Sequence, residues 1–202
     1  MRIGPKYKIS RRLKAPIFEK TQTQKFALSL EKKSQKRGGR PASDFGIQLI
    51  EKQKVRYFYG LAEKQFKNYV KKALAKKGST TAMLDSMLES RLDNVVWRAG
   101  LAPTHAAARQ MVVHGHICIN GKKVYSPSYE MSPDVVIFVR EGSKKSPLFN
   151  KEKDENMQKV LPAWLVFDES KKEIRVKSKP ARGDSDKDSL LDLGKVIEFY
   201  QR

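Results

Sequence analysis

The chain has 202 residues and a formal net charge of +20, from 42 lysines and arginines against 22 aspartates and glutamates. Such an excess of positive charge indicates a polyanionic partner, most commonly nucleic acid, and the length allows one or two modest hydrophobic cores. Cys118 is the single cysteine, which excludes the disulfide framework of small secreted proteins, and no apolar run approaches the roughly 20 residues of a membrane-spanning helix. We therefore expect a nucleic-acid-binding protein of a reducing compartment, with no membrane partner.

The amino-terminal segment, residues 1–42, is predicted to be a basic, flexible arm. It has 13 basic and 2 acidic side chains, few large apolar groups and a Gly38-Gly39-Arg40-Pro41 linker. A segment of this kind buries too little apolar surface to fold alone, so we expect it to become ordered only on the nucleic acid. Its candidate RNA contacts are Arg2, Lys6, Lys8, Arg11, Arg12, Lys14 and Arg40.

Two amphipathic helices follow the arm. Ser43 or Asp44 can cap the first, which should run to about Tyr59, and the second should end at Gly78. Positive charge is concentrated up to this point, since residues 1–77 hold 22 basic and 5 acidic side chains. Both helices have a basic face opposite the apolar one, with candidate RNA contacts Lys52, Lys54, Arg56, Lys64, Lys67, Lys71 and Lys72.

The next run predicts further helices and then a tight hairpin. An apolar three-four repeat that opens at Thr80 continues to Gly100 and indicates a helix that bridges two domains. Thr104 can cap a second helix, and Asn120-Gly121 tolerates the positive φ angles of a type I′ turn. One rim of this region should then gather the candidate RNA contacts Arg109, Gln110, His114, His116, Lys122 and Lys123. His114 is equally compatible with a helix-end position, where its cation favours the carbonyl end of the dipole.

The carboxy-terminal third predicts strands, loops and a last helix. Apolar and β-branched runs indicate strands at residues 135–139, 164–167 and 174–176, which with the hairpin make a small mixed sheet. The polar stretches 142–159 and 178–189 have no sustained period and should be loops. Residues 190–200 have apolar side chains at helical spacing, enough to dock on an element that is already folded.

Several of these runs resemble one known family. The run LDNVVWRAGLAPTHAAARQMVVHGHICINGKKV is similar to the RNA-binding module named after small-subunit ribosomal protein S-four, which also occurs in pseudouridine synthases, a heat-shock protein and tyrosyl-tRNA synthetases. The run RIGPKYKISRR resembles the amino-terminal arm of the ribosomal family, and SDFGIQLIEKQKVRYFYGLAEKQFKNY resembles its first helical domain. With the terminal IEFYQR, the likeness covers most of the chain, which is identified as a member of this family in its bacterial form.

The resemblance implies an α+β fold with three parts. These are the arm at residues 1–42, a helical domain at residues 43–90 plus 190–202, and an inserted RNA-binding module of two short helices on a mostly antiparallel sheet at residues 91–189. The implied function is a structural one, in which the chain binds small-subunit ribosomal RNA at a helix junction of the five-prime domain and nucleates assembly. Implied partners are neighbouring small-subunit ribosomal proteins and messenger RNA near the channel where it enters, with an effect on decoding accuracy. The implied location is the small subunit in the bacterial cytoplasm, although an organelle of bacterial descent fits as well.

The chain departs from the family pattern at two places. His105 stands where the module usually has an arginine that touches RNA, so we treat it as a weaker RNA ligand. Ser132-Pro133-Asp134 replaces the usual Pro-Gly-Asp before the last module strand, which changes the expected turn but not the strand.

We expect no metal, cofactor, catalytic residue or small-molecule substrate. Some family members bind zinc through cysteines of the arm, but the arm has none here. His114, His116 and Cys118 alternate and could share one face, yet structural zinc normally takes four ligands from two separated pairs. No phosphate loop, nucleophile elbow or dinucleotide fingerprint is present. The alternative to a ribosomal protein is a free-standing RNA-binding stress or ribosome quality-control factor, which needs the module but not residues 1–77.

Overall fold

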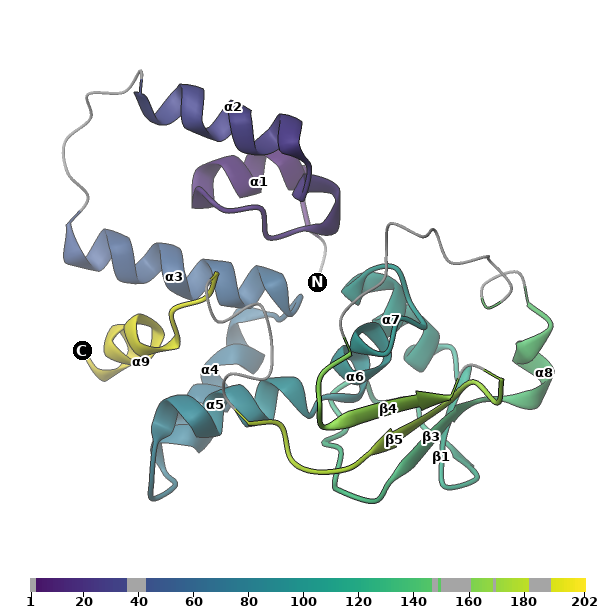
Figure 1. Ribbon diagram of the computed structural model, residues 1–202. Coiled ribbons are helices and arrows are strands. Elements are labelled where there is room, and N and C mark those ends of the chain that lie inside the picture. The colour runs from purple at the N-terminus through teal and green to yellow at the C-terminus, as the bar shows by residue number, and fades with distance from the viewer. Residues whose placement is uncertain (1–2, 36–42, 147–148, 150–160, 169, 182–189) are drawn as a thin grey trace. The chain divides into compact units, whose positions relative to one another are not determined.

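The computed structural model describes residues 3–35, 43–146, 149, 161–168, 170–181 and 190–202 (Figure 1). The chain divides into two compact units. Unit 1 comprises Met1–Leu84 and Asp186–Arg202, and unit 2 comprises Asp85–Ser185. Helices dominate unit 1, while unit 2 combines helices with a five-stranded antiparallel sheet, so the α+β prediction is confirmed.

The structure corrects the expectation of a flexible amino-terminal arm. The segment forms helix α1 (Lys6–Leu13), a short 3₁₀ helix η1 (Glu19–Thr21) and helix α2 (Gln24–Gln35). Its few apolar side chains suffice because they are buried together, including Leu13, Ile17, Phe18 and Phe26. The segment does not stand alone, since the ring of Phe18 meets the ring of Tyr57 on the next helix edge-on at 6.3 Å.

Helices α3 (Asp44–Phe58) and α4 (Glu63–Leu74) follow in unit 1. Of the two predicted caps, Ser43 or Asp44, the structure shows Ser43, whose side chain accepts a hydrogen bond from the Gly46 amide at 3.3 Å. The carboxy-terminal helix α9 (Leu193–Gln201), yellow in Figure 1, returns to lie beside α3. Gln48 Nε2 donates to Glu198 Oε2 at 3.0 Å across this contact. Helices that are far apart in the sequence therefore pack together in unit 1.

A second correction concerns the apolar repeat that opens at Thr80. The structure has two helices there, α5 (Thr80–Glu89) and α6 (Leu92–Arg98), separated at Ser90 and Arg91. The break arises because the backbone pairs with a distant segment: Leu92 N donates to Tyr129 O at 2.9 Å, and Met131 N donates to Ser90 O at 2.8 Å. These two bonds take the place of hydrogen bonds within a helix. The apolar repeat therefore runs across the break, but its residues belong to two helices.

The sheet of unit 2 has the order β2-β1-β3-β5-β4, and every neighbouring pair is antiparallel. Its strands are β1 (Ile117–Ile119), β2 (Lys122–Lys123), β3 (Val136–Val139), β4 (Leu165–Asp168) and β5 (Glu173–Val176). The predicted hairpin is present, because Ile119 pairs with Lys122 while Asn120 and Gly121 have φ of 45° and 85°. At the altered turn before β3, Asp134 takes a left-handed φ of 64°, and the strand that follows is intact.

Helix α7 (His105–Val113) completes the core of unit 2, and the short α8 (Glu141–Lys144) follows β3. Thr104 caps α7 as predicted, with Ala107 N donating to its hydroxyl at 3.1 Å. Parts of the polar stretches 142–159 and 178–189 lie outside the described residues. The core itself is made of fully buried aliphatic residues from α6, α7 and the strands, namely Val95, Val96, Ala108, Val112, Ile117, Ile137 and Ile174.

Candidate nucleic-acid interface

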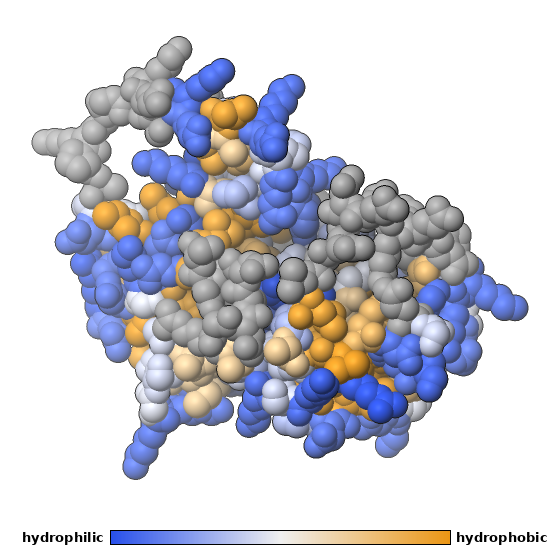
Figure 2. Space-filling view, viewed as in Figure 1, coloured by the Kyte–Doolittle hydropathy of each residue, from blue (hydrophilic) through white to orange (hydrophobic). Residues whose placement is uncertain are grey.

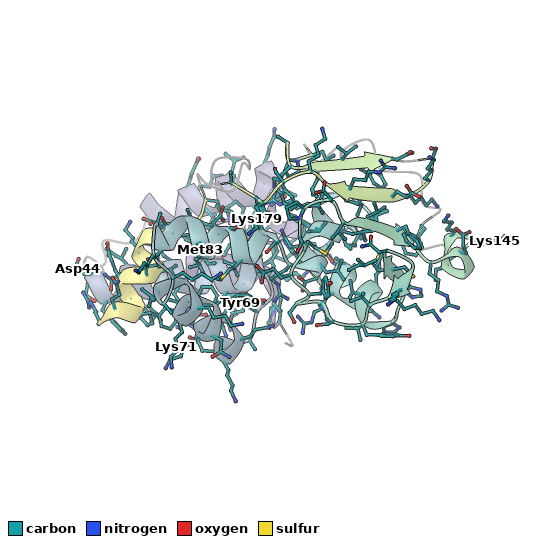
Figure 3. All side chains as sticks on the ribbon, turned by 90° about the horizontal axis from the view of Figure 1, so that it is seen from below. Asp44, Tyr69, Lys71, Met83, Lys145 and Lys179 are labelled. Carbon is teal, nitrogen blue, oxygen red and sulfur yellow. The ribbon has the colours of Figure 1, made fainter. Side chains whose placement is uncertain are left out.

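Helix α4 presents a largely basic exposed face. Phe66, Val70 and Ala73 are fully buried on its inner side. The predicted RNA contacts on this helix, Lys64, Lys67, Lys71 and Lys72, are all exposed. Figure 3 shows Lys71 on the outer side of the helix, and we call these four lysines the α4 lysine face. Sequence reasoning overlooked Lys76 and Lys77, which are exposed just beyond it and which the charge count alone could have added.

The predicted contacts on helix α3 are arranged differently, because they face carboxylates of unit 1. Lys52 is 6% exposed, and its Nζ lies 2.7 Å from Glu63 Oε1. Arg56 Nε lies 3.6 Å from the other oxygen of Glu63. Lys54 Nζ pairs with Glu51 at 2.6 Å. Lys52 and Arg56 therefore connect α3 to α4, while Lys54 pairs within α3. All three have carboxylate partners, in contrast to the open α4 lysine face.

Glu63 is the centre of this internal cluster. The Tyr200 hydroxyl donates to Glu63 Oε1 at 2.9 Å, so α3, α4 and α9 meet at one carboxylate. Burial alone would raise the pKa of Glu63, but the hydrogen bonds from Lys52 and Tyr200 and the charges of Lys52 and Arg56 outweigh it and lower that pKa. Burial, together with Glu63, raises the pKa of Tyr200 far above its ordinary value. Both shifts favour a carboxylate facing a neutral phenol.

The basic residues of the first helical segment are mostly open to solvent. Figure 2 shows hydrophilic side chains, in blue, over much of the visible face of α1 and α2. Lys6 is half-buried, with its Nζ 5.5 Å from the centre of the Phe18 ring. The exposed members of the predicted set are Lys8, Arg11, Arg12 and Lys14, whereas Arg2 and Arg40 lie outside the described residues.

In unit 2, the side chain of Arg109 is held beside a buried ion pair. Arg91 is 1% exposed and donates to both carboxylate oxygens of Asp93, from Nε at 3.0 Å and from Nη2 at 2.7 Å. Arg109 Nη1 lies 3.7 Å from the same carboxylate, while 39% of the Arg109 side chain remains exposed. This arrangement restricts the guanidinium and leaves donors available, and the neighbouring Gln110 is exposed.

His105 belongs to an internal network rather than to the open surface. Its Nε2 lies 3.1 Å from Asn94 Oδ1, and its ring stacks on Trp97 with centroids 3.8 Å apart. Asn94 Nδ2 donates to Glu89 Oε2 at 3.0 Å, and Arg98 Nε donates to the same oxygen at 3.1 Å. The half-buried histidine thus has specific protein partners, a feature that its sequence position did not indicate.

The remaining predicted contacts surround the hairpin. Lys122 and Lys123 are exposed and pair across the sheet with Ile119 and Cys118. His114 is exposed at the end of α7, and its ring lies 6.1 Å from that of His116. We call Gln110, His114, His116, Lys122 and Lys123 the hairpin rim.

The hairpin rim contains no arrangement suited to a metal. His116 Nδ1 lies 2.9 Å from the Ser143 hydroxyl, and Cys118 is 5% exposed. Throughout the part of the chain that the structure describes, no group of three or more histidine, cysteine or acidic side chains is arranged to hold a metal ion. Hydrogen-bond donors and cations on fixed elements remain, which suits the recognition of phosphates and ribose hydroxyls.

Comparison with known families matches two successive stretches of the chain. Residues 1–89 match the model described as the ribosomal protein S4/S9 N-terminal domain, and residues 90–137 match the S4 domain. The junction between the matches coincides with the break between α5 and α6. Within the described ranges, no helix is both long and apolar enough to cross a membrane. Because the two matches together span residues 1–137 without a gap, the chain belongs to the ribosomal protein S4 family, a family of structural, non-enzymatic proteins that bind ribosomal RNA in the small ribosomal subunit.

Proposed function

We propose that the chain binds small-subunit ribosomal RNA at a helix junction of the five-prime domain and helps to nucleate assembly of the subunit. The observation that carries this proposal is that both units present cations on rigid elements. Unit 1 has the α4 lysine face, and unit 2 has the hairpin rim with Arg109 beside it. Two tethered surfaces raise each other's effective concentration and can hold several RNA helices in one orientation.

The recognition is one of shape. Double-helical RNA hides its base edges in a deep, narrow groove, so a protein that organises a junction reads phosphates and ribose hydroxyls. The α4 lysine face supplies point charges at helical spacing, which suits a phosphate backbone running along the helix. Arg109 supplies a partly fixed fork of donors, which suits a contact at one defined place.

The contact residues are the exposed cations rather than the internal ones. We assign direct RNA contact to the α4 lysine face, the hairpin rim, Arg109 and the exposed basic residues of α1. Lys52 and Arg56 instead keep α3 in place beside α4, and Lys54 pairs with Glu51 within α3, because the charges of all three already have carboxylate partners. His105 acts through its contact with Asn94, which lies on the helix preceding α7.

The remaining parts of the proposal concern location and neighbours. We place the protein in the small subunit of a bacterial ribosome, in contact with neighbouring ribosomal proteins and near the channel through which messenger RNA enters. There it contributes to decoding accuracy. The family match at residues 1–89 supports this over a free-standing stress or quality-control factor, which does not need that part. Sedimentation of a cell extract separates the two, since a ribosomal protein is stoichiometric in the small-subunit peak and a stress factor is not.

Salt dependence tests the electrostatic part of the proposal. If about six phosphates are neutralised, log affinity for a five-prime-domain transcript should fall against log salt concentration with a slope of roughly −4 to −5. Changing the four α4 lysines to alanine should make that slope shallower by roughly 3.

A matched control removes the same charge from elsewhere. Lys145, Lys171, Lys177 and Lys179 are four exposed lysines of unit 2 that do not belong to the hairpin rim, and their change to alanine should alter the slope less. Equal slopes for the two quadruple variants would show that the α4 lysine face is not the contact surface.

A further inference from the structure

Tyr125 is the most exposed aromatic residue in the part of the chain that the structure describes, and like Tyr129 it lacks the ring contacts that Tyr7 and Phe45 make. It is 59% exposed, compared with 47% for Tyr7 and 50% for Phe45. Tyr7 meets the ring of Phe26 at 6.0 Å, and Phe45 meets that of Phe199 at 5.5 Å. For Tyr125, no ring contact or side-chain hydrogen bond is found among the residues that the structure describes. A large π-face on a strongly basic protein is thus left open.

The ring is nevertheless held in place. A Cβ atom built on Gly115 would lie 2.6 Å from Cε1 of Tyr125 and 3.3 Å from its Cδ1, so one edge of the ring rests where a side chain would otherwise be. Gly115 is fixed by the end of α7, where its amide donates to Val112 O at 2.9 Å and the His116 amide donates to Met111 O at 3.1 Å. Val124 N continues the hairpin pairing by donating to Ile117 O at 3.3 Å. The close approach is to one side of the ring, at Cε1, and 59% of Tyr125 remains exposed.

Exposed lysines and a histidine lie near Tyr125 in the sequence and on the partner side of the hairpin. Lys122 and Lys123 precede Tyr125 by three and two residues, and both are exposed. His114 is exposed beside Gly115. An aromatic face next to cations is the arrangement on which proteins stack unpaired bases while holding the flanking phosphates.

We propose that Tyr125 stacks on one unpaired nucleobase of the bound RNA, with Lys122 and Lys123 holding the phosphates on either side. This inference rests on the proposed function, and it adds a single-stranded contact to a surface otherwise suited to helices. A ring that packs against a backbone position already fixed in the fold loses less freedom on stacking than a fully mobile side chain does. The sequence position of Tyr125, two residues beyond a hairpin strand, would not indicate this role.

The test compares four proteins, each with all 202 residues, on a cognate and a scrambled RNA. Wild type, Tyr125→Leu, Tyr125→Phe and Tyr129→Leu are titrated with a five-prime-domain transcript of small-subunit ribosomal RNA and with a scrambled transcript of equal length. Loss of one stacked base should weaken cognate binding by roughly 5-fold to 150-fold in Tyr125→Leu. Tyr125→Phe keeps the ring and should bind as wild type does. Tyr129 is also exposed, at 46%, and its change to leucine should have little effect.

Photochemical cross-linking gives a second measurement that altered folding would not mimic. Ultraviolet light should join the wild-type protein and Tyr125→Phe to one nucleotide of the transcript through residue 125, and this product should be absent from Tyr125→Leu. The inference is overturned if Tyr125→Leu binds within twofold of wild type, if Tyr125→Phe loses as much affinity as Tyr125→Leu, or if Tyr129→Leu does so. If wild type does not prefer the cognate transcript, the proposed function fails and the inference fails with it.

Discussion

Replacing Asp93 with asparagine should destabilise unit 2 severely. The change keeps the size of the side chain but removes the charge that faces Arg91, whose guanidinium is 1% exposed and bonded at 3.0 Å and 2.7 Å. Removing one partner of a buried ion pair costs about 3 to 5 kcal/mol, because the remaining charge stays in a poorly solvating environment. For a unit of this size, 1 kcal/mol shifts the melting temperature by about 4 to 8 °C, so the unit should melt at least roughly 12 °C lower.

Circular dichroism and amide hydrogen exchange measure this effect. Exchange of the Leu92 amide, which donates to Tyr129 O at 2.9 Å, should accelerate and so localise the loss to unit 2. The control is Glu141→Gln, which breaks an exposed pair with Lys144 in the same unit and should leave the melting temperature nearly unchanged.

The double variant Arg91→Met with Asp93→Asn tests the cause. If the cost comes from losing the negative charge that faces the buried guanidinium, removing the guanidinium should recover part of the lost stability. An Asp93→Asn protein that melts within about 2 °C of wild type would refute the reasoning, because the loss expected from a buried pair is several times larger. A double variant that is less stable than Asp93→Asn alone would refute it as well.

Three further predictions concern pH, capping and metal. The pKa of Glu63 is lowered from its ordinary 4.5, so its carboxylate stabilises unit 1 above pH 4.5 and this contribution is lost as the pH falls through the lowered value. Glu63→Gln should therefore lower the urea midpoint at pH 7 and reduce its further fall on acidification to pH 3, whereas equal falls in both proteins would contradict the cluster. Thr104→Ala removes the cap of α7 and should cost about 1 kcal/mol in urea unfolding, with no measurable change contradicting the assignment. Elemental analysis should find no stoichiometric zinc and chelation should leave the melting curve unchanged, while a chelator-sensitive curve would show that His114, His116 and Cys118 bind metal.

The sequence predicted the turns and helix caps correctly, because the geometry of each depends on only a few neighbouring residues. Asn120-Gly121 tolerates the two positive φ angles of a tight turn, and it takes them here, so the hairpin pairing agrees with the prediction. The caps at Ser43 and Thr104 depend on a hydroxyl three residues from its donor, and both form as predicted. For the site, the same kind of reasoning found the α4 lysines, because an amphipathic helix exposes its polar face.

The features that the sequence did not predict depend on contacts with residues that are far away in the sequence. The apolar repeat from Thr80 looked continuous because nothing near Ser90 signals that residues 127–131 will pair with its backbone. Lys52 looked like a surface lysine because its partners, Glu63 and the ring of Phe199, belong to other helices. A basic side chain can thus be assigned to a helix face from sequence, but whether it meets solvent or a carboxylate depends on tertiary packing.

The return of α9 to α3 has a consequence for the order in which the chain is made. Synthesis proceeds from the amino end, so α3 and α4 emerge long before Leu193–Gln201, and until then Glu63 lacks the Tyr200 hydroxyl. Unit 2 has a core of its own and can fold before α9 has been synthesised. The folded unit then connects α4 and α9 in place of a long flexible loop, which lowers the entropic cost of docking α9 on α3. A message cut short before Leu193 would yield a finished unit 2 attached to an unfinished unit 1. Unit 1 therefore lacks the contact between α3 and α9 until Leu193–Gln201 has been synthesised, although unit 2 can already be folded.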